Sequence, residues 1–307
     1  MARILVTPRS LTQDPPRELS ILTEAGHELV FSTPGKLPGE EELIELLPGC
    51  TGWLAGIEPV SPRVIAAADT LKAVSRNGTG VDNLPLADLE RKGVRVLRAE
   101  GANATGVAEL AVALMLAVLR GIPAADHGIK AGGWPRQRGK EMRGRVVGVV
   151  GCGAVGRQVA QIASAMGSQI IGYDPYPRDF ATSGPFSWAS LDELFSQSDV
   201  VSLHCPPLAD GTFLIDEARV ESMRPGSVIV NTARAALVDE QALRAALDGG
   251  RLHGYGTDVF AVEPPESGSL AFHPKVVATS HIGGFTEESV SRATEAAIRN
   301  LLDALAS

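Results

Sequence analysis

The feature that most constrains this fold is a three-glycine turn between a short apolar segment and a helical one. The apolar segment, Val146–Val150, is rich in β-branched residues and too short for a typical helix, so it predicts a buried strand. Gly151, Gly153 and Gly156 follow with the spacing G-x-G-x-x-G, and apolar residues then recur at helical intervals up to Met166. The turn therefore predicts a strand–turn–helix unit of a parallel α/β sheet.

Each glycine of this turn has its own task if the turn binds a dinucleotide. The first permits a tight turn, the second lets the backbone approach a pyrophosphate, and the third lets the helix pack on the strand. The helix then directs its N-terminal N–H groups and positive dipole end at the phosphates. The alternative interpretation is a glycine-rich βαβ turn without a ligand.

A carboxylate follows the next expected strand and indicates which dinucleotide is bound. Gln169–Tyr173 predicts that strand, and Asp174 ends it, where a carboxylate accepts hydrogen bonds from an adenosine ribose. Asp174 would repel a 2′-phosphate, and the first arginine after it is Arg178. The sequence therefore predicts NAD rather than NADP as the cofactor.

Strand and helix patterns alternate along all 307 residues, a length that is typical of two domains. The first series of expected strands is Ile4–Thr7, Glu28–Phe31, Gly52–Ala55, Leu71–Ser75 and Val94–Leu97. The second series is Val146–Val150, Gln169–Tyr173, Val200–Leu203, Ser227–Asn231, Leu252–Thr257 and Val276–Thr279. This alternation predicts the α/β class, with parallel sheets covered by helices and a doubly wound sheet in the second series.

Two helical segments need a particular place in such a fold. Thr105–Arg120 carries Glu109 as its only charge before Arg120, so we expect it to be buried on all sides, between domains or subunits. Thr286–Leu305 has one apolar face and is expected to pack back on the first unit. The longest apolar run is too short to span a bilayer, and the N-terminus lacks a signal peptide. We therefore expect a cytoplasmic protein without a membrane partner.

The composition excludes several other classes of function. The net charge of −8 argues against a nucleic-acid partner, which would require a basic surface. Cys50, Cys152 and Cys205 form no disulfide framework, and no Cys/His cluster has the spacing of a zinc site. We therefore predict no metal, and Cys152 is expected to be a small filler in the glycine turn.

Three later segments place chemically active side chains directly after expected strands, where ligands bind in such sheets. SVIVNTARAALVDEQAL carries Arg234, whose guanidinium can hold a carboxylate through two parallel hydrogen bonds. HGYGTDVFAVEPPE carries Asp258 and Glu263, and VVATSHIGGFTEES carries His281. Taken singly, Arg234 is as well explained as a surface arginine, and Glu263 and His281 are better explained as a solvated glutamate and a structural histidine.

Taken in order after GCGAVG, the motifs NTARAALVDE, GTDVFAVEPP and TSHIGG resemble the D-isomer-specific 2-hydroxyacid dehydrogenases. RNGTGVDNL and ANATGVAEL resemble the same family, so the resemblance covers essentially the whole chain, and it is greatest to phosphoglycerate-dehydrogenase-like members. It implies a flavodoxin-like substrate domain, residues 1–100 plus 281–307. It also implies a Rossmann NAD-binding domain, residues 101–280, with a cleft between the two. Members are typically homodimers, joined through the cofactor domain and the loop around Trp134.

The resemblance also implies an NAD-dependent interconversion of a D-2-hydroxy acid and its 2-oxo acid. Arg234 would bind the substrate carboxylate, His281 would act as acid and base, and Glu263 would orient and tune the histidine. The implied cofactor residues are Gly151, Gly153, Ala154, Val155, Gly156, Asp174, Cys205, Pro206, Thr232, Ala233, Asp258, Gly283 and Gly284. The implied substrate residues are Arg76, Asn77, Gly78, Thr79 and Gly80, whose backbone N–H groups would cradle the carboxylate.

The substrate itself stays open at this point. Animal-type phosphoglycerate dehydrogenases offer Arg-Ser where this chain has Ala55–Gly56, so one phosphate partner is missing, and Arg76, Arg136 or Arg138 would have to replace it. The chain stops at Ser307, so we expect the short form without a C-terminal regulatory domain. The resemblance offers 3-phosphoglycerate as one candidate substrate; the alternatives are a glyoxylate/hydroxypyruvate reductase and an NAD-sensing, corepressor-like binding protein. Formate dehydrogenase is disfavoured, because it carries glutamine where Glu263 stands.

Overall fold

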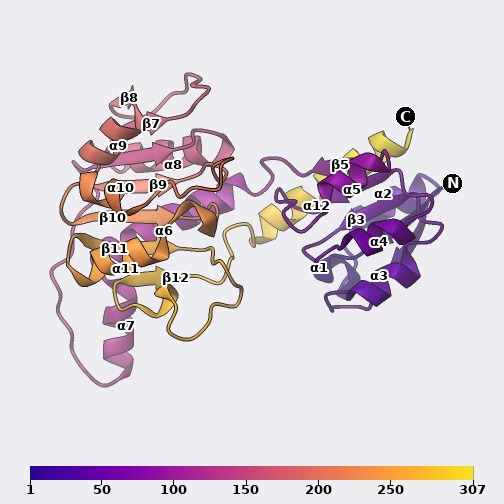
Figure 1. The fold of residues 1–307 in the computed structure, drawn as a ribbon, viewed down its shortest axis with the longest axis horizontal. Coiled ribbons are helices and arrows are strands. Elements are labelled where there is room, and N and C mark those ends of the chain that lie inside the picture. The colour runs from indigo at the N-terminus through magenta and orange to yellow at the C-terminus, as the bar shows by residue number, and fades with distance from the viewer. Residues whose placement is uncertain (307) are drawn as a thin grey trace. The chain divides into compact units, whose positions relative to one another are not determined.

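The protein, in a computed structural model that describes residues 1–306, is built from two α/β units (Figure 1). Unit 1 consists of Met1–Asn103 and residues 287–306, and unit 2 of Ala104–Thr286. The predicted boundaries were a few residues earlier, at 100/101 and 280/281. The segment 281–286 belongs to unit 2 because the backbone N–H groups of Ile282 and Gly283 donate to Asp258.

Unit 1 has a parallel five-stranded sheet in the order β2-β1-β3-β4-β5. Its strands are β1 (Arg3–Val6), β2 (Glu28–Phe31), β3 (Gly52–Ala55), β4 (Ala73–Arg76) and β5 (Arg95–Arg98). Its helices are α1 (Arg9–Gln13), η1 (Arg17–Leu19), α2 (Ser20–Glu24), α3 (Glu40–Leu46), α4 (Pro62–Ala67), α5 (Leu86–Arg91) and α12 (Glu287–Ala306). The strand order reverses between β1 and β3, the position at which open α/β sheets bind ligands.

The C-terminal helix α12 completes the core of unit 1, as the sequence predicted. Its Ala297, Ile298 and Leu301 are fully buried and cluster with Ile4 and Val6 of β1. The hydroxyl of Ser75 on β4 also donates to the Ala297 carbonyl at 2.7 Å, which fixes the helix on the sheet.

Unit 2 has a parallel seven-stranded sheet in the order β12-β11-β10-β9-β6-β7-β8. Its strands are β6 (Val146–Val150), β7 (Gln169–Tyr173), β8 (Phe186–Trp188), β9 (Val200–Leu203), β10 (Ser227–Asn231), β11 (Leu252–Thr257) and β12 (Val276–Ala278). Its helices are α6 (Ala104–Arg120), α7 (Ile122–Lys130), α8 (Ala154–Ala165), α9 (Leu191–Gln197), α10 (Glu217–Ser222), α11 (Glu240–Asp248), η2 (Ala235–Leu237) and η3 (Leu270–Phe272). The six predicted strands are confirmed, β8 is additional, and the doubly wound α/β class is confirmed for both units.

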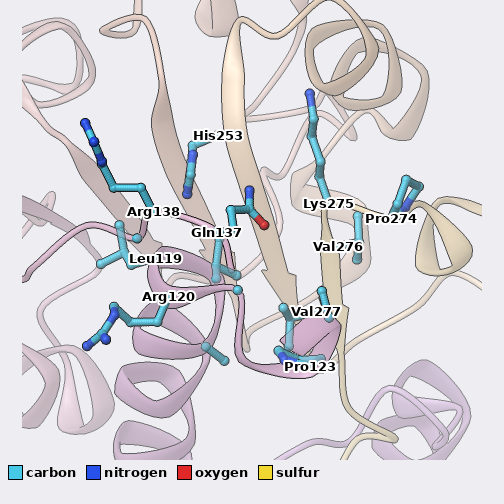
Figure 2. Close-up of a pocket in the computed structure, with 15 residues that line it drawn as sticks. Leu119, Arg120, Pro123, Gln137, Arg138, His253, Pro274, Lys275, Val276 and Val277 are labelled. Atoms are coloured by element: carbon cyan, nitrogen blue, oxygen red, sulfur yellow. The ribbon is translucent and has the colours of Figure 1, made fainter. Parts of the chain in front are cut away.

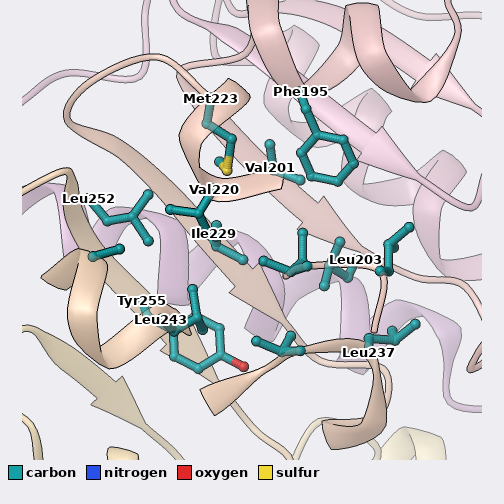
Figure 3. Close-up of a cluster of buried hydrophobic side chains, with 14 of the residues drawn as sticks. Phe195, Val201, Leu203, Val220, Met223, Ile229, Leu237, Leu243, Leu252 and Tyr255 are labelled. Atoms are coloured by element: carbon teal, nitrogen blue, oxygen red, sulfur yellow. The ribbon is translucent and has the colours of Figure 1, made fainter. Parts of the chain in front are cut away.

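Apolar side chains cover both faces of the unit 2 sheet. Phe195, Ile229 and Tyr255 belong to the cluster on one face, which Figure 3 shows. On the other face, α6 and α8 pack against the strands, and Met115 of α6 is fully buried. The predicted burial of the apolar helix is thus confirmed for most of its positions but not on all sides, because Ala113 is exposed.

None of the helices within residues 1–306 is both long and apolar enough to cross a membrane by itself. The pair α6 and α7 meets the length and composition criteria only when the two are taken together, and a bend of 65° separates them.

Candidate functional site

The residues predicted to carry chemistry in unit 2 lie at one edge of its sheet. All neighbouring strands are parallel, so their carboxyl ends meet at that edge. Asp174 follows β7, Thr232–Arg234 follow β10, Asp258 follows β11, and His281 follows β12 after two residues. This is the edge at which ligands bind in sheets of this type.

The glycine turn after β6 shows why two of its glycines are required by packing. Gly151 has a φ of +88°, and a Cβ there would stand 2.7 Å from the carbonyl carbon of His204. A Cβ at Gly156 would stand 1.9 Å from the Gly151 oxygen. A Cβ at Gly153 would meet nothing within 4 Å. The first and third glycines therefore allow close packing, and the second borders open space.

The N-terminus of α8 faces this open space without a side-chain cap. Gly153 is the N-cap residue, and its carbonyl accepts from Arg157 N at 3.2 Å. The N–H groups of the first turn, from Ala154 to Gly156, are those that a helix leaves without an intrahelical partner. An uncapped helix start with an open glycine before it fits the pyrophosphate of a dinucleotide.

Asp174 lies beside this turn, because β6 pairs with β7 up to Val150 and Tyr173. Its Oδ2 accepts from Cys152 N and its Oδ1 from Tyr176 N, both at 2.9 Å. The carboxylate is thereby fixed at the rim of the turn, and its predicted contact with the adenosine ribose stays a prediction.

The two cysteines near the turn are not poised for redox chemistry. Burial raises the pKa of the Cys152 thiol to about 12 and that of the Cys205 thiol to about 11, so both stay protonated at neutral pH. Cys205 borders the turn with its backbone instead, because its nitrogen is 2.8 Å from where a Cβ at Gly151 would stand. The exposed Pro206 follows it.

The segment after β10 is held by the side chain of Asn231. Its Nδ2 donates to the Arg234 carbonyl at 2.8 Å, and its Oδ1 accepts from Ala233 N at 3.0 Å. The Arg234 Nη1 donates to the Ala233 carbonyl at 2.7 Å. The buried hydroxyl of Thr232 has no hydrogen-bond partner in the described part of the chain. An orphaned buried hydroxyl at a strand end fits the polar nicotinamide that was predicted to lie there.

Asp258 is almost fully buried and holds the loop that carries His281. Its Oδ1 accepts from the Thr279 hydroxyl at 2.7 Å and from Ile282 N at 2.9 Å, and its Oδ2 accepts from Gly283 N at 2.7 Å. Gly284 continues the same loop, half-buried. Sequence reasoning missed Thr279 and this positioning role; the bond from Asp258 to the nicotinamide amide stays a prediction.

His281 and Glu263 form a direct contact. The Nδ1 atom of His281 is 2.8 Å and 2.9 Å from the two Glu263 oxygens, and both side chains are about half exposed. Glu263 is fixed in turn by Phe260 N, which donates to its Oε1 at 3.2 Å. His281 has a φ of +55°, an uncommon backbone conformation for a non-glycine residue that is concentrated at functional sites. A carboxylate on Nδ1 assigns the proton to that nitrogen and leaves Nε2 for proton exchange.

In unit 1, the predicted substrate loop follows β4. Asn77 N donates to the Ala55 carbonyl and Gly78 N to the Arg76 carbonyl, both at 2.8 Å. Two of the expected donors are thus used by carbonyl groups of β3 and β4, and the binding of a carboxylate by Thr79 and Gly80 stays a prediction. Gly78 has a φ of +147°, which only glycine adopts readily.

A pocket in unit 2 lies away from these residues (Figure 2). His253 and Lys275, which line it, stand at the amino ends of β11 and β12, opposite to the edge that carries the candidate site. Burial lowers the pKa of His253, and the charges of Lys140, Arg145 and Lys275 lower it further.

Residues 1–306 contain no group of three or more His, Cys, Asp or Glu side chains arranged to hold a metal ion.

Comparisons with known proteins agree with this geometry. The family model "D-isomer specific 2-hydroxyacid dehydrogenase, NAD binding domain" matches residues 112–283. A hydroxypyruvate reductase of Thermotoga maritima is 38% identical over 82% of this chain and 84% of that protein. A D-3-phosphoglycerate dehydrogenase of Mycobacterium bovis is 40% identical over 83% of this chain and 49% of that protein. The chain therefore spans about half the length of that second relative.

Among solved structures, the TT0316 protein of Thermus thermophilus superimposes with a TM-score of 0.88 at 33% identity. The match covers 99% of this chain and 97% of that protein. The order of strands and helices is thus shared along the whole length.

Proposed function

This chain belongs to the D-isomer specific 2-hydroxyacid dehydrogenase family, with an NAD-binding domain in unit 2, and we propose that it interconverts a D-2-hydroxy acid and its 2-oxo acid. The contact between His281 Nδ1 and the Glu263 carboxylate carries the proposal. It supplies an oriented imidazole at the carboxyl edge of a sheet that also carries the glycine turn.

The proposed reaction needs one proton for each hydride. NAD, when bound, supplies or accepts the hydride at the substrate C2. His281 Nε2 donates a proton to the 2-oxo group in reduction and removes one from the hydroxyl in oxidation. Glu263 keeps a proton on Nδ1, so that Nε2 gives up its proton in reduction and takes one up in oxidation, and Asp258 fixes the loop on which the ring stands.

Arg234 is proposed to bind the substrate carboxylate. A guanidinium forms two parallel hydrogen bonds with a carboxylate and so fixes its plane as well as its distance. The backbone of Arg234 is held by Asn231, so the side chain starts from a fixed point at the sheet edge. In unit 1, the N–H groups of Thr79 and Gly80 are proposed as further donors to the substrate.

Two substrates are proposed from the relatives. Hydroxypyruvate is supported by the reductase of Thermotoga maritima, most of whose length this chain matches. 3-Phosphoglycerate is supported by the D-3-phosphoglycerate dehydrogenase of Mycobacterium bovis. Its sequence is 40% identical to this chain, but the match covers only 49% of its length. Compared as 2-oxo acids, hydroxypyruvate and 3-phosphohydroxypyruvate differ in one phosphate group, so the charge around the substrate decides between them.

The direct test is NADH consumption by the purified chain with hydroxypyruvate, glyoxylate, pyruvate and 3-phosphohydroxypyruvate. We expect turnover of at least one of them. NADH binding, followed by its fluorescence, without turnover of any 2-oxo acid would contradict the enzymatic proposal and favour an NAD-sensing binding protein.

We also propose a homodimer formed through unit 2. Helix α7 has no buried residue, and Ile122 and Ile129 on it are more than half exposed. Trp134 in the loop that follows is 79% exposed. Large apolar side chains that are this exposed favour an interface with a second chain. Light scattering should give about twice the chain mass of 32.1 kDa, and Trp134→Glu should lower it to one chain mass.

A further inference from the structure

A fully buried carboxylate lies in unit 1, at a place that no sequence motif marks. Glu58 follows β3 and is 0% exposed. Its Oε1 accepts from the Thr7 hydroxyl and, at 2.9 Å, from Gly56 N. Its Oε2 is buried and has no hydrogen-bond partner within residues 1–306.

The surroundings hold this carboxylate rigidly. Thr7 accepts from the indole nitrogen of Trp53 at 2.9 Å, so the hydroxyl is directed at Glu58. Asn83 Nδ2 donates to the Glu58 carbonyl at 2.6 Å and to the Gly56 carbonyl at 3.3 Å. A Cβ at Gly56 would stand 2.6 Å from Glu58 Oε2, so the carboxylate fills the space that any side chain at 56 would need.

A buried guanidinium stands at the end of β4, the strand next to β3. Arg76 ends β4 and is 8% exposed; its Nη1 donates to the Asn77 carbonyl at 2.7 Å, and its Nε has no partner in the described chain. Burial lowers the pKa of Arg76, and the charges of Glu58 and Asp82 oppose that shift. The negative charges of Glu58 and Asp82 therefore act on the Arg76 guanidinium and offset part of its positive charge.

This charge cluster lies where unit 1 binds a ligand under the proposed function. Thr7 follows β1 and Glu58 follows β3, the two strands between which the strand order reverses. Arg76 is directly followed by Asn77–Gly80, the proposed substrate loop. A charge fixed in a buried network acts over several ångströms, because little water screens it.

We infer that Glu58 is a specificity-determining residue that excludes phosphorylated substrates and restricts this protein to 2-oxo acids whose only anionic group is the carboxylate. The inference rests on the proposed function and selects between its two substrates. Glu58 offsets part of the positive charge of the buried Arg76 next to the substrate loop and adds a negative charge that a phosphate would meet. A substrate with a neutral substituent, such as hydroxypyruvate, meets no such repulsion.

The test compares kcat/KM for 3-phosphohydroxypyruvate with kcat/KM for hydroxypyruvate in NADH-dependent reduction. For the wild-type chain we expect a ratio below about 0.01. Glu58→Gln keeps an acceptor for Thr7 and Gly56 but removes the charge, and it should raise the ratio roughly tenfold or more. Glu58→Asp keeps the charge and should leave the ratio low. Glu90→Gln, an exposed site on α5, removes the same charge elsewhere and should change nothing.

A structural role alone would lower both activities together and leave their ratio unchanged, so an unchanged ratio in a folded Glu58→Gln chain overturns the inference. A wild-type ratio near or above one overturns it without any variant, which covers the case in which Glu58→Gln does not fold. If the wild-type chain reduces neither compound although NADH binds, the proposed function fails for both of its substrates, and the inference fails with it.

Discussion

At the scale of single residues, His281 and Glu263 show how two half-exposed side chains are held in contact. The histidine occupies a left-handed backbone conformation, and the glutamate is fixed by the backbone of Phe260. Neither side chain is buried, so water competes with their contact, and the surrounding hydrogen bonds supply the positioning that burial would otherwise give.

Glu263→Gln tests this positioning. The amide keeps one acceptor for His281 Nδ1 but loses the charge that stabilises the protonated ring, so kcat for the 2-oxo acid should fall roughly ten- to a hundredfold. The Kd of NADH should stay within about twofold of the wild-type value. Glu266→Gln, an exposed neighbour in the same loop, serves as control. Equal losses in both variants would mean that the charge of Glu263 has no special part.

The sequence identified the proposed catalytic trio because each member follows an apolar strand within a recognisable motif. It did not identify Glu58, since one acid in the loop between β3 and α4 carries no pattern, and its burial depends on Thr7, 51 positions away. Thr279 was missed for a related reason: its hydroxyl acts through Asp258, across two strands.

At the scale of elements, the glycine turn contains one glycine that is required for packing, Gly156, and one that borders open space, Gly153. Gly156 fits only because it has no Cβ against the Gly151 carbonyl, whereas Gly153 adopts a φ of −76° that any residue adopts. A substitution at Gly153 should therefore weaken cofactor binding, whereas a substitution at Gly156 should lower the stability of the fold.

Gly153→Ala should fold with a thermal midpoint within about 2 °C of the wild type and raise the Kd of NADH roughly tenfold or more. The added methyl group meets no protein atom but occupies the approach to the start of α8. Gly156→Ala should lower the thermal midpoint by several degrees, because the strand and the helix must separate. Unchanged NADH affinity in Gly153→Ala would refute the phosphate-binding role of the turn.

Asp258→Asn tests how the loop after β12 is held. An amide offers one oxygen and places N–H donors opposite the N–H groups of Ile282 or Gly283, so at least one buried bond is lost. Hydrogen exchange at Ile282 and Gly283 should quicken, and kcat should fall roughly tenfold. Asp179→Asn, at an exposed site, is the control. Wild-type exchange rates in Asp258→Asn would contradict the positioning role.

Among the elements that the sequence did not predict, β8 and α7 were missed because of their length and exposure. The strand β8 has three residues at the sheet edge, too few for a period-two pattern to be recognised. Helix α7 has no buried face in the chain alone, so no apolar stripe marks it. Extensively buried elements such as α6 and β6 were predicted almost to their ends, because extensive burial leaves a nearly continuous apolar run.

At the scale of the whole molecule, the alternation of strands and helices determined both sheets, and right-handed crossovers then limit their strand orders to a few. The second unit boundary lies at 286/287 rather than at the expected 280/281. It depends on the hydrogen bonds of Ile282 and Gly283 with Asp258, which no local pattern reveals.

The lowered pKa of His204 predicts that part of the stability of the fold is lost in acid. Part of the His204 residue reaches solvent, but burial around its ring lowers its pKa to about 3, against about 6.5 in an unfolded chain. As the pH falls through this window the unfolded chain takes up the proton first, so stability present above about pH 6.5 is lost progressively towards about pH 3. Between about pH 7 and 4.5 the thermal midpoint of His204→Gln should fall several degrees less than that of the wild type. His127→Gln, an exposed site on α7, should behave as the wild type, and an equal fall in His204→Gln would contradict this origin.

Whether His281 exchanges the substrate proton is measured most simply by the rate of hydroxypyruvate-dependent NADH oxidation in His281→Asn. Asparagine tolerates the left-handed backbone of this position, so the loop should keep its conformation. We expect a kcat lower by about 10²–10⁴-fold with an unchanged Kd for NADH. A variant that folds, binds NADH and turns over at the wild-type rate would show that the proton moves through another group.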